Sequence, residues 1–340
     1  MRIVVDVMGG DHGCEVVVLG AKLALEANSK ITELHLVGNE PDVCSALKAV
    51  GLSDRRVLIT HASQVLTMED KPVEGLRRKK DCSLLRAVDL LKDGRADAMV
   101  SLGNTGGLVA ASTIRLRTLP GVDRPAIAAV IPSETHEFIL VDAGANPDCK
   151  PIHLAQFAIM GSVYSQEILK RDRPRVGVLS NGTENTKGTE LTREASVLCS
   201  QLGLNFVGYV EGHDLYSGGV EVVVTDGFVG NIVLKTSESL VKGIFGILKK
   251  ELMATPIRKI GAMLSKGAFR AIKRTMDPDA HGGAPLLGLN GNVIKAHGSA
   301  RERAIMNAIR VASEAVEHRI NDLIVKQIAA TQASPATLSQ

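Results

Sequence analysis

Short apolar runs and helical patterns alternate along most of the chain. Residues 2–7 form the first β-branched run, after which Val16, Leu19 and Leu23 recur on one side of a predicted helix. Strands are also predicted near 33–38, 57–62, 96–101, 125–131, 137–141, 175–179, 220–224 and 293–296, and most of them precede a helical pattern. Strands that alternate with helices in this way are typical of an α/β fold with a mostly parallel sheet.

One pair of strands departs from this alternation. The runs 125–131 and 137–141 are separated only by Pro132-Ser133-Glu134-Thr135-His136, which is too short a connection for a helix. This spacing predicts an antiparallel hairpin, so we expect a mixed sheet. The charged connection before residue 83 contains Arg77-Arg78-Lys79-Lys80, which is either a solvated loop or a docking point for an anionic partner.

Loops rich in Gly, Asp, Asn and Ser follow five of the predicted strands, and each leads into a helix. The clearest is Ser101-Leu102-Gly103-Asn104-Thr105-Gly106-Gly107, where glycines and cap residues would leave backbone N–H groups free at the positive end of a helix. Such a place attracts phosphate or a developing oxyanion. One such loop is as often a capped turn without a ligand. Because parallel strands end along one edge of a sheet, five of them predict a site there.

Composition excludes several classes of protein. Among 340 residues only 3% are aromatic and none is Trp, which leaves few stacking platforms for single-stranded nucleic acid. No apolar run approaches the ~18 residues of a membrane span. Walker A, G-x-G-x-x-G and H-E-x-x-H sequences do not occur, so we expect no cofactor and no metal. The five scattered cysteines and the lack of a secretory leader predict reduced thiols and a cytoplasmic location.

The net charge of +3 hides a basic segment at 239–276, which holds nine Lys or Arg against Glu251. Its local charge of +8 leaves −5 for the rest of the chain. Apolar residues at helical spacing and the Thr255-Pro256 start predict two amphipathic helices. These helices either pack on the core and leave their lysines in solvent, or lie on an anionic lipid surface. We favour the lipid surface. The cations expected at the membrane are Lys249, Lys250, Arg258, Lys259 and Lys266.

The domain organisation expected is one catalytic domain over 1–330, from which 239–276 projects as a helical hairpin, with 331–340 as a flexible tail. A glycine-rich apolar loop at 281–291 precedes the strand that ends in His297-Gly298-Ser299. Ser299 is expected to cap the long terminal helix. A histidine beside Gly and Ser often makes only structural hydrogen bonds, but its place at a strand end makes His297 an equal candidate for catalysis.

The loops together indicate a family. In order along nearly the whole chain stand Asp6-Val7-Met8-Gly9-Gly10-Asp11, Ser101-Leu102-Gly103-Asn104-Thr105-Gly106, Asp142-Ala143-Gly144-Ala145-Asn146, Asn181-Gly182-Thr183-Glu184 with Lys187-Gly188, Asp226-Gly227-Phe228-Val229-Gly230-Asn231, and His297-Gly298-Ser299. In these motifs the chain resembles the phosphate acyltransferases of bacterial phospholipid synthesis, which make acyl phosphate from acyl-acyl carrier protein and inorganic phosphate. It departs from them at His12-Gly13-Cys14 and at Gly107, without loss of a polar group.

The resemblance implies a three-layer α/β/α fold similar to isopropylmalate dehydrogenases and phosphotransacetylases. It also implies a homodimer with sites near the subunit interface, and peripheral association with the inner face of the cell membrane. A downstream glycerol-phosphate acyltransferase is a further expected partner. By motif position Lys187 and Asn231 are the expected catalytic residues, with His297 added from its strand end. The expected substrate-binding residues are Asp6, Gly9, Gly10, Asp11, Ser101, Gly103, Asn104, Thr105, Asp142, Asn146, Asn181, Glu184 and Asp226.

Acyl transfer to phosphate demands little acid–base chemistry, because phosphate is already anionic and a thiol of pKa about 8.5 is a tolerable leaving group. We expect backbone N–H groups, Lys187 and Asn231 to hold the dianion against the thioester and to stabilise the oxyanion. His297 would donate to phosphate or to the departing sulfur, while Asp226 would orient Lys187 or the loops. Two alternatives are a phosphotransacetylase-like enzyme that uses coenzyme A thioesters and a non-catalytic membrane-docking scaffold.

Overall fold

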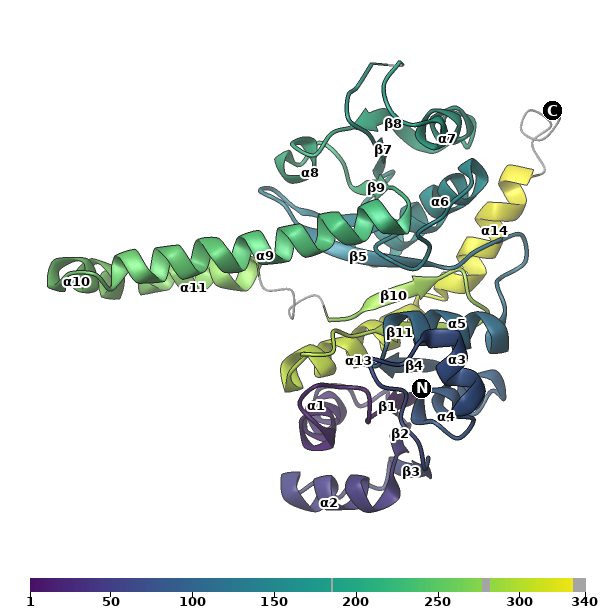
Figure 1. Ribbon diagram of the computed structural model, residues 1–340, viewed down its shortest axis with the longest axis vertical. Coiled ribbons are helices and arrows are strands. Elements are labelled where there is room, and N and C mark those ends of the chain that lie inside the picture. Colours follow the sequence, from purple (N-terminus) through teal and green to yellow (C-terminus); the bar gives the residue numbers. More distant parts are fainter. Residues whose placement is uncertain (185, 277–281, 333–340) are drawn as a thin grey trace.

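A single mixed sheet runs through the computed structural model, which describes residues 1–184, 186–276 and 282–332 (Figure 1). Its 11 described strands lie in the order β3-β2-β1-β4-β11-β10-β5-β6-β9-β7-β8. The strands are β1 (Arg2–Asp6), β2 (Glu33–Gly38), β3 (Val57–His61), β4 (Ala98–Ser101), β5 (Ala126–Pro132), β6 (Glu137–Val141), β7 (Arg175–Leu179), β8 (Asn205–Val210), β9 (Val222–Val224), β10 (Ala284–Leu287) and β11 (Asn292–Lys295). The predicted α/β class with a mostly parallel, mixed sheet is confirmed.

The two halves of this sheet run in opposite directions. β1, β2, β3, β4 and β11 are mutually parallel, and β10 is antiparallel to both β11 and β5. The predicted hairpin is present as β5 and β6, and it reverses the chain. The strands β6, β9, β7 and β8 are therefore parallel to one another but antiparallel to β1.

Helices cover both faces of the sheet. They are α1 (Cys14–Ala27), α2 (Glu40–Val50), α3 (Pro72–Arg78), α4 (Ser83–Lys92), α5 (Thr105–Leu116), α6 (Pro151–Glu167), α7 (Glu190–Ser200), α8 (Asp214–Ser217), α9 (Gly227–Leu252), α10 (Pro256–Leu264), α11 (Lys266–Thr275), α13 (Glu302–Glu317) and α14 (Ile320–Gln332). On β1, Ile3 and Val5 pack with α1 and α13, whereas Val4 packs with α4 and α5. On β6, Ile139 packs with α6 and α14 on the opposite face from Leu140. This alternation produces the three layers.

Several local predictions are wrong. The charged connection before residue 83 contains the helix α3, the apolar loop at 281–291 contains the strand β10, and β8 was not predicted. Ser299 does not cap the terminal helix, because α13 begins at Glu302 and a left-handed residue, Arg319, separates it from α14. α14 includes Thr331 and Gln332, which were expected in the tail; the rest of that expected tail, residues 333–340, and His281 lie outside the described residues.

The basic segment belongs to a longer helix than predicted. α9 is continuous from Gly227 to Leu252, and the second predicted helix is divided at Ser265 into α10 and α11. Figure 1 shows α9 running out past the sheet, with α10 at its far end. Apolar side chains here are exposed, for example Ile257 at 82% and Leu264 at 79%. The alternative in which these helices pack on the core is therefore wrong for this chain.

Candidate active site

The polar loops that follow the strands lie in two groups. The first loop group, defined as residues 6–13, 101–107 and 296–300, follows β1, β4 and β11. The second loop group, defined as residues 142–147, 180–188 and 225–231, follows β6, β7 and β9. Because the β5–β6 hairpin reverses the second half of the sheet, the two groups begin at opposite edges. The prediction that all the loops gather along one edge is wrong, since β6, β7 and β9 run antiparallel to β1, β4 and β11.

Three side chains form a row at the strand ends from which the first loop group leaves the sheet. Asp6, Ser101 and Lys295 occupy the same register position on β1, β4 and β11. Ser101 Oγ donates to Asp6 Oδ2 at 2.9 Å, and Lys295 Nζ donates to the Leu102 carbonyl at 3.3 Å. Burial raises the pKa of Asp6, which the hydrogen bonds from neighbouring serines oppose. The side chains of Asp6 and Ser101 therefore make hydrogen bonds that hold the loops in shape.

The glycines of the first loop group allow other protein segments to come close. A Cβ on Gly9 would lie 2.5 Å from the Gly103 backbone, and one on Gly107 would lie 2.3 Å from Leu66. Asn104 caps α5 by accepting from Gly107 N at 2.9 Å, and its amide donates to three carbonyls of residues 67–70 at 3.3 Å. Residues 66–72 therefore cover much of the helix start, which is less open than the sequence predicted.

A buried carboxylate organises the second loop group. Asp142 is fully buried, and it accepts hydrogen bonds from the backbone N–H groups of Ile127, Gly144, Ala145 and Asn146 at 2.7–3.2 Å. Burial raises its pKa, whereas these donors favour the charged form. The Asn146 amide donates to the same carboxylate at 2.8 Å. Asp142 and Asn146 consequently fix the loop on which the start of α9 rests.

Asn231 is presented by the first turns of α9. Asp226 caps this helix, accepting from Phe228 N and Val229 N at 2.9 Å. Asn231 itself is exposed, and its Cβ would lie 3.4 Å from a Cβ built on Gly144. The predicted binding residues Asp226, Asp142 and Asn146 therefore hold the backbone that positions Asn231.

Lys187 lies in the loop after β7. Asn181 Oδ1 accepts from Gly188 N at 2.9 Å, and Lys187 N donates to the Glu184 carbonyl at 2.9 Å, so the loop is closed on itself. The Lys187 and Glu184 side chains are exposed. β7 is the parallel neighbour of β9 and pairs Val178 with Val224, so this loop and the start of α9 leave the same edge of the sheet.

α9 connects the two loop groups. Lys235 lies one helical turn after Asn231, on the same side of the helix. Its Nζ is 3.1 Å from His297 Nε2 and 3.1 Å from Glu238 Oε2. Lys235 therefore lies between the two predicted catalytic residues Asn231 and His297, although the sequence did not predict it as a site residue. Its four-residue spacing from Asn231 was the sequence signal that could have found it.

Two basic groups here have lowered pKa values. Burial, and then the neighbouring Lys235, lower the pKa of Lys295 to about 8. Burial and Lys235 also lower the pKa of His297, whose Nδ1 lies 2.8 Å from Ser299 Oγ. Ser299 N–H donates to His297 Nδ1 at 3.2 Å, and His297 Nε2 faces Lys235 Nζ. The sequence did not predict a role for Lys295, because it is a single polar residue in the otherwise apolar predicted strand 293–296.

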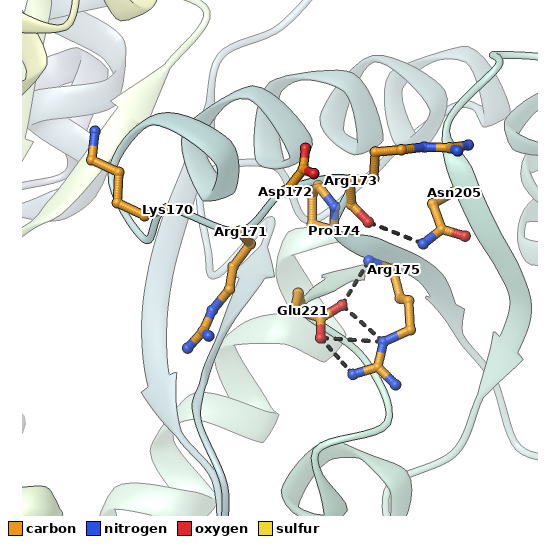
Figure 2. A pocket seen from close by; sticks show the side chains of 8 residues that line it. All are labelled: Lys170, Arg171, Asp172, Arg173, Pro174, Arg175, Asn205 and Glu221. Atoms are coloured by element: carbon orange, nitrogen blue, oxygen red, sulfur yellow. Dashed lines mark hydrogen bonds and ion pairs between the residues drawn. The ribbon is translucent and has the colours of Figure 1, made fainter.

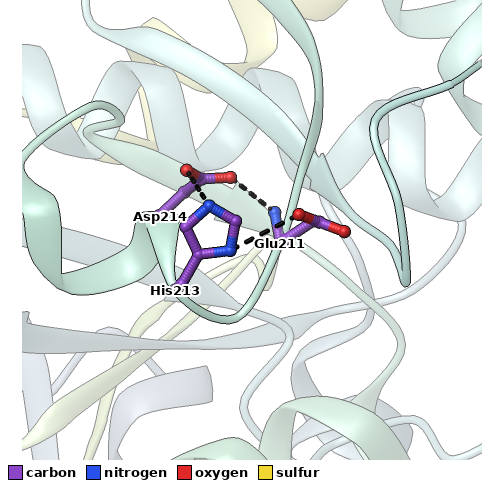
Figure 3. A group of neighbouring side chains, drawn as sticks. All are labelled: Glu211, His213 and Asp214. Carbon is purple, nitrogen blue, oxygen red and sulfur yellow. Dashed lines mark hydrogen bonds and ion pairs between the residues drawn. The ribbon is translucent and has the colours of Figure 1, made fainter.

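Two other clusters were considered. A hollow of about 340 Å³ lies at the start of β7. Figure 2 shows the residues that line it, Lys170, Arg171, Asp172, Arg173, Pro174, Arg175, Asn205 and Glu221. Arg175 and Glu221 pair there within 2.7–3.2 Å, and the hollow lies at the opposite end of β7 from the Lys187 loop. Figure 3 shows Glu211, His213 and Asp214, whose ligand-type atoms lie within 4.8 Å of one another. His213 is exposed, and its contacts with the two carboxylates, at 3.4 and 3.2 Å, account for this cluster.

Comparison with known proteins agrees with the motifs and the fold. Residues 1–323 match the family described as fatty acid synthesis protein. Relatives named phosphate acyltransferase include one from Syntrophotalea carbinolica, 46% identical over 96% of this chain and 93% of its own, and one from Desulfitobacterium hafniense, 46% identical over 96% and 98%. The chain therefore belongs to this family, that of the phosphate acyltransferases.

Solved structures share the fold at low sequence identity. A phosphotransacetylase from Streptococcus pyogenes covers 93% of this chain and 94% of its own with a TM-score of 0.65 at 18% identity. A branched-chain phosphotransacylase from Enterococcus faecalis covers 92% and 99% with a TM-score of 0.55 at 15% identity. The predicted similarity to the phosphotransacetylase fold is confirmed.

Proposed function

We propose that this chain transfers a fatty acyl group from acyl-acyl carrier protein to inorganic phosphate, giving acyl phosphate for phospholipid synthesis. The observation that carries the proposal is the path of α9, which places Asn231 one turn from Lys235 and Lys235 against His297. This line of amide, ammonium and imidazole groups joins the two loop groups. Family membership supports the reaction class.

The chemistry needs positioning and charge rather than a strong base. Asn231 on the first turns of α9 and Lys187 in the loop after β7 lie at the same edge of the sheet, and both are proposed to donate to the thioester oxygen as it becomes an oxyanion. Asp142, Asn146 and Asp226 hold these loops in place before substrate arrives. His297, whose pKa is lowered by burial and by Lys235, is proposed to lie beside the phosphate.

A hydroxylamine trap tests this function. The purified full chain is supplied with phosphate and either palmitoyl-acyl carrier protein or palmitoyl-coenzyme A, and acyl phosphate is captured as hydroxamate. We expect hydroxamate to form from the carrier-protein donor, to require phosphate, and to form more slowly from coenzyme A. Faster turnover of coenzyme A thioesters would favour a phosphotransacetylase-like enzyme, and no hydroxamate from either donor would favour a scaffold.

The exposed surface of α9, α10 and α11 is proposed to bind a second copy of the chain and an anionic membrane. Its apolar side chains, such as Ile247, Ile257 and Met263, are more than half exposed. No described helix is long and apolar enough to cross a membrane. Burial of these apolar side chains against the helices of a second copy would stabilise a dimer, and burial at a lipid interface would stabilise membrane binding. Each cation near an anionic membrane surface adds about 1 kcal/mol to membrane binding.

Charge reversal at Lys249, Lys250, Lys259 and Lys266 tests the membrane part. The fourfold change to Glu is expected to abolish sedimentation with phosphatidylglycerol vesicles while solution activity is retained, because these lysines lie far along the helices from Asn231. The control changes three exposed lysines outside these helices, Lys48, Lys92 and Lys326, to Glu and should sediment like the wild type. Sedimentation that survives the fourfold change would exclude lipid binding by this segment.

A further inference from the structure

Two lysines outside the predicted site lie where α9 passes the end of β11. Lys235 Nζ lies 3.1 Å from His297 Nε2, and it is near enough to Lys295 to lower the pKa of that lysine. Lys295 donates to the carbonyls of Leu102 and Ala296, but in the described part of the chain no ion pair joins it to a carboxylate. A largely buried ammonium without a close anionic partner is costly to the fold, so its presence at a strand end indicates a ligand.

We infer that Lys235 and Lys295, together with His297, bind the phosphate that the reaction consumes. This inference rests on the proposed function and assigns one of its two substrates to a defined place. Phosphate is the substrate that fits, because its oxygens accept from several donors at once and it carries the charge that two ammonium groups favour. The acyl thioester is neutral at its reacting carbonyl and gains little from this position.

Charged groups from several elements face the two lysines. Asp6 of β1 is buried and accepts from Ser101, Glu238 of α9 pairs with Lys235, and Asp11 lies exposed beside Gly298. Lys242 also acts on His297. Asp6 and Asp11 favour the charged form of Lys295, but burial and Lys235 outweigh them and lower its pKa to about 8. Phosphate beside Lys295 would raise that pKa again, so binding and protonation stabilise each other.

The position also suits the reaction. Asn231 and Lys235 are four residues apart on α9, so their Cβ atoms are about 6 Å apart on one side of the helix. A thioester carbonyl at Asn231 would then lie next to a phosphate at Lys235. A phosphate oxygen forms the bond to the carbonyl carbon, the carbon–sulfur bond breaks, and the proton of hydrogenphosphate passes to the departing thiolate.

Equilibrium dialysis with radiolabelled inorganic phosphate tests the site without any acyl chemistry. Compared with the wild type, Lys235→Met and Lys295→Met are expected to bind phosphate roughly 10- to 100-fold more weakly, as for loss of a hydrogen bond to a charged group. Lys48→Met removes an exposed lysine on α2 and should bind normally. Lys235 is half exposed, so its variant should fold even if Lys295→Met does not.

Kinetics on the same variants separates this inference from the proposed function. The KM for phosphate should rise in Lys235→Met, while the KM for palmitoyl-acyl carrier protein stays within about twofold, since a purely structural defect would raise both. Wild-type affinity for phosphate in both variants, or no phosphate binding by the wild type, would overturn the inference. Phosphate binding that the variants lose, in a protein that forms no acyl phosphate, would instead reject only the proposed function.

The pH dependence gives an independent test. With a pKa of about 8, Lys295 is charged below that pH and becomes neutral above it. The affinity ratio between the wild type and Lys295→Met should therefore be large at pH 7 and fall toward one as the pH rises past the Lys295 pKa in the phosphate complex. The titration of phosphate itself is common to both proteins and cancels in this ratio. A ratio near one already at pH 7 would contradict a charged Lys295 in the site.

Discussion

Lys187→Ala is expected to lower kcat/KM for acyl transfer by roughly 10²- to 10³-fold, the effect of losing one donor to a developing oxyanion. The exposed Lys187 side chain leaves the same sheet edge as Asn231, because β7 and β9 are parallel neighbours. The loop is closed by Asn181 and by backbone hydrogen bonds, so the variant should keep its fold. Initial rates of hydroxamate formation measure the loss.

Thr186→Ala is the matched control for this change. Thr186 is also exposed, in the same loop, and the expected rate is that of the wild type. Turnover near the wild-type rate in a folded Lys187→Ala protein would show that this lysine takes no part in the reaction. Equal losses in both variants would show that the loop acts only through its shape.

Gly230→Ala is expected to destabilise the protein by about 3 kcal/mol or more, although alanine is normally the better helix residue. A Cβ at this position would lie 1.9 Å from the Asp142 carbonyl oxygen, and that backbone is fixed by the buried carboxylate of Asp142. The first turn of α9 would have to move, and Asn231 would move with it. Urea unfolding measures the stability, and the hydroxamate assay measures the activity.

The same helix supplies the control for Gly230. Gly243→Ala places the same methyl group where nothing lies within 4 Å in this chain, so it should stabilise the protein by about 0.5–1 kcal/mol. Similar unfolding midpoints for the two variants would contradict the close packing of α9 on Asp142. That packing is what fixes the direction in which α9 crosses between the loop groups.

The sequence predicted the elements better than their relative direction. β-branched runs and the five-residue connection at 132–136 were sufficient to predict the strands and the hairpin. The hairpin also determines that β6, and with it β7, β8 and β9, run antiparallel to β1, whereas the later strand β11 returns to the direction of β1. This separates the loops into two groups. The path of α9, which brings Asn231 toward His297, could not be predicted from the sequence. It depends on a contact between Lys235 and His297, which only tertiary packing determines.

Glycines illustrate a second limit of sequence reasoning. A glycine-rich loop indicates close approach, but not what approaches. At Gly9 and Gly107 the neighbour is the chain itself, namely Gly103 and Leu66. Likewise, the polar type of Asp142 suggested substrate binding, whereas its five hydrogen bonds from the loop and one from Ile127 of β5 show a carboxylate that organises backbone. Burial separates these two roles, and burial of a polar residue cannot be read from its type.

The most direct test of acyl transfer to phosphate uses phosphate labelled with ¹⁸O in every oxygen. The full chain is incubated with palmitoyl-acyl carrier protein and this phosphate, and the products are analysed by mass spectrometry. Attack by a phosphate oxygen predicts palmitoyl phosphate that retains all of the labelled oxygens, with the carbonyl oxygen unlabelled. Release of unlabelled palmitate with no labelled acyl phosphate would show attack by water instead, and would contradict the proposed reaction.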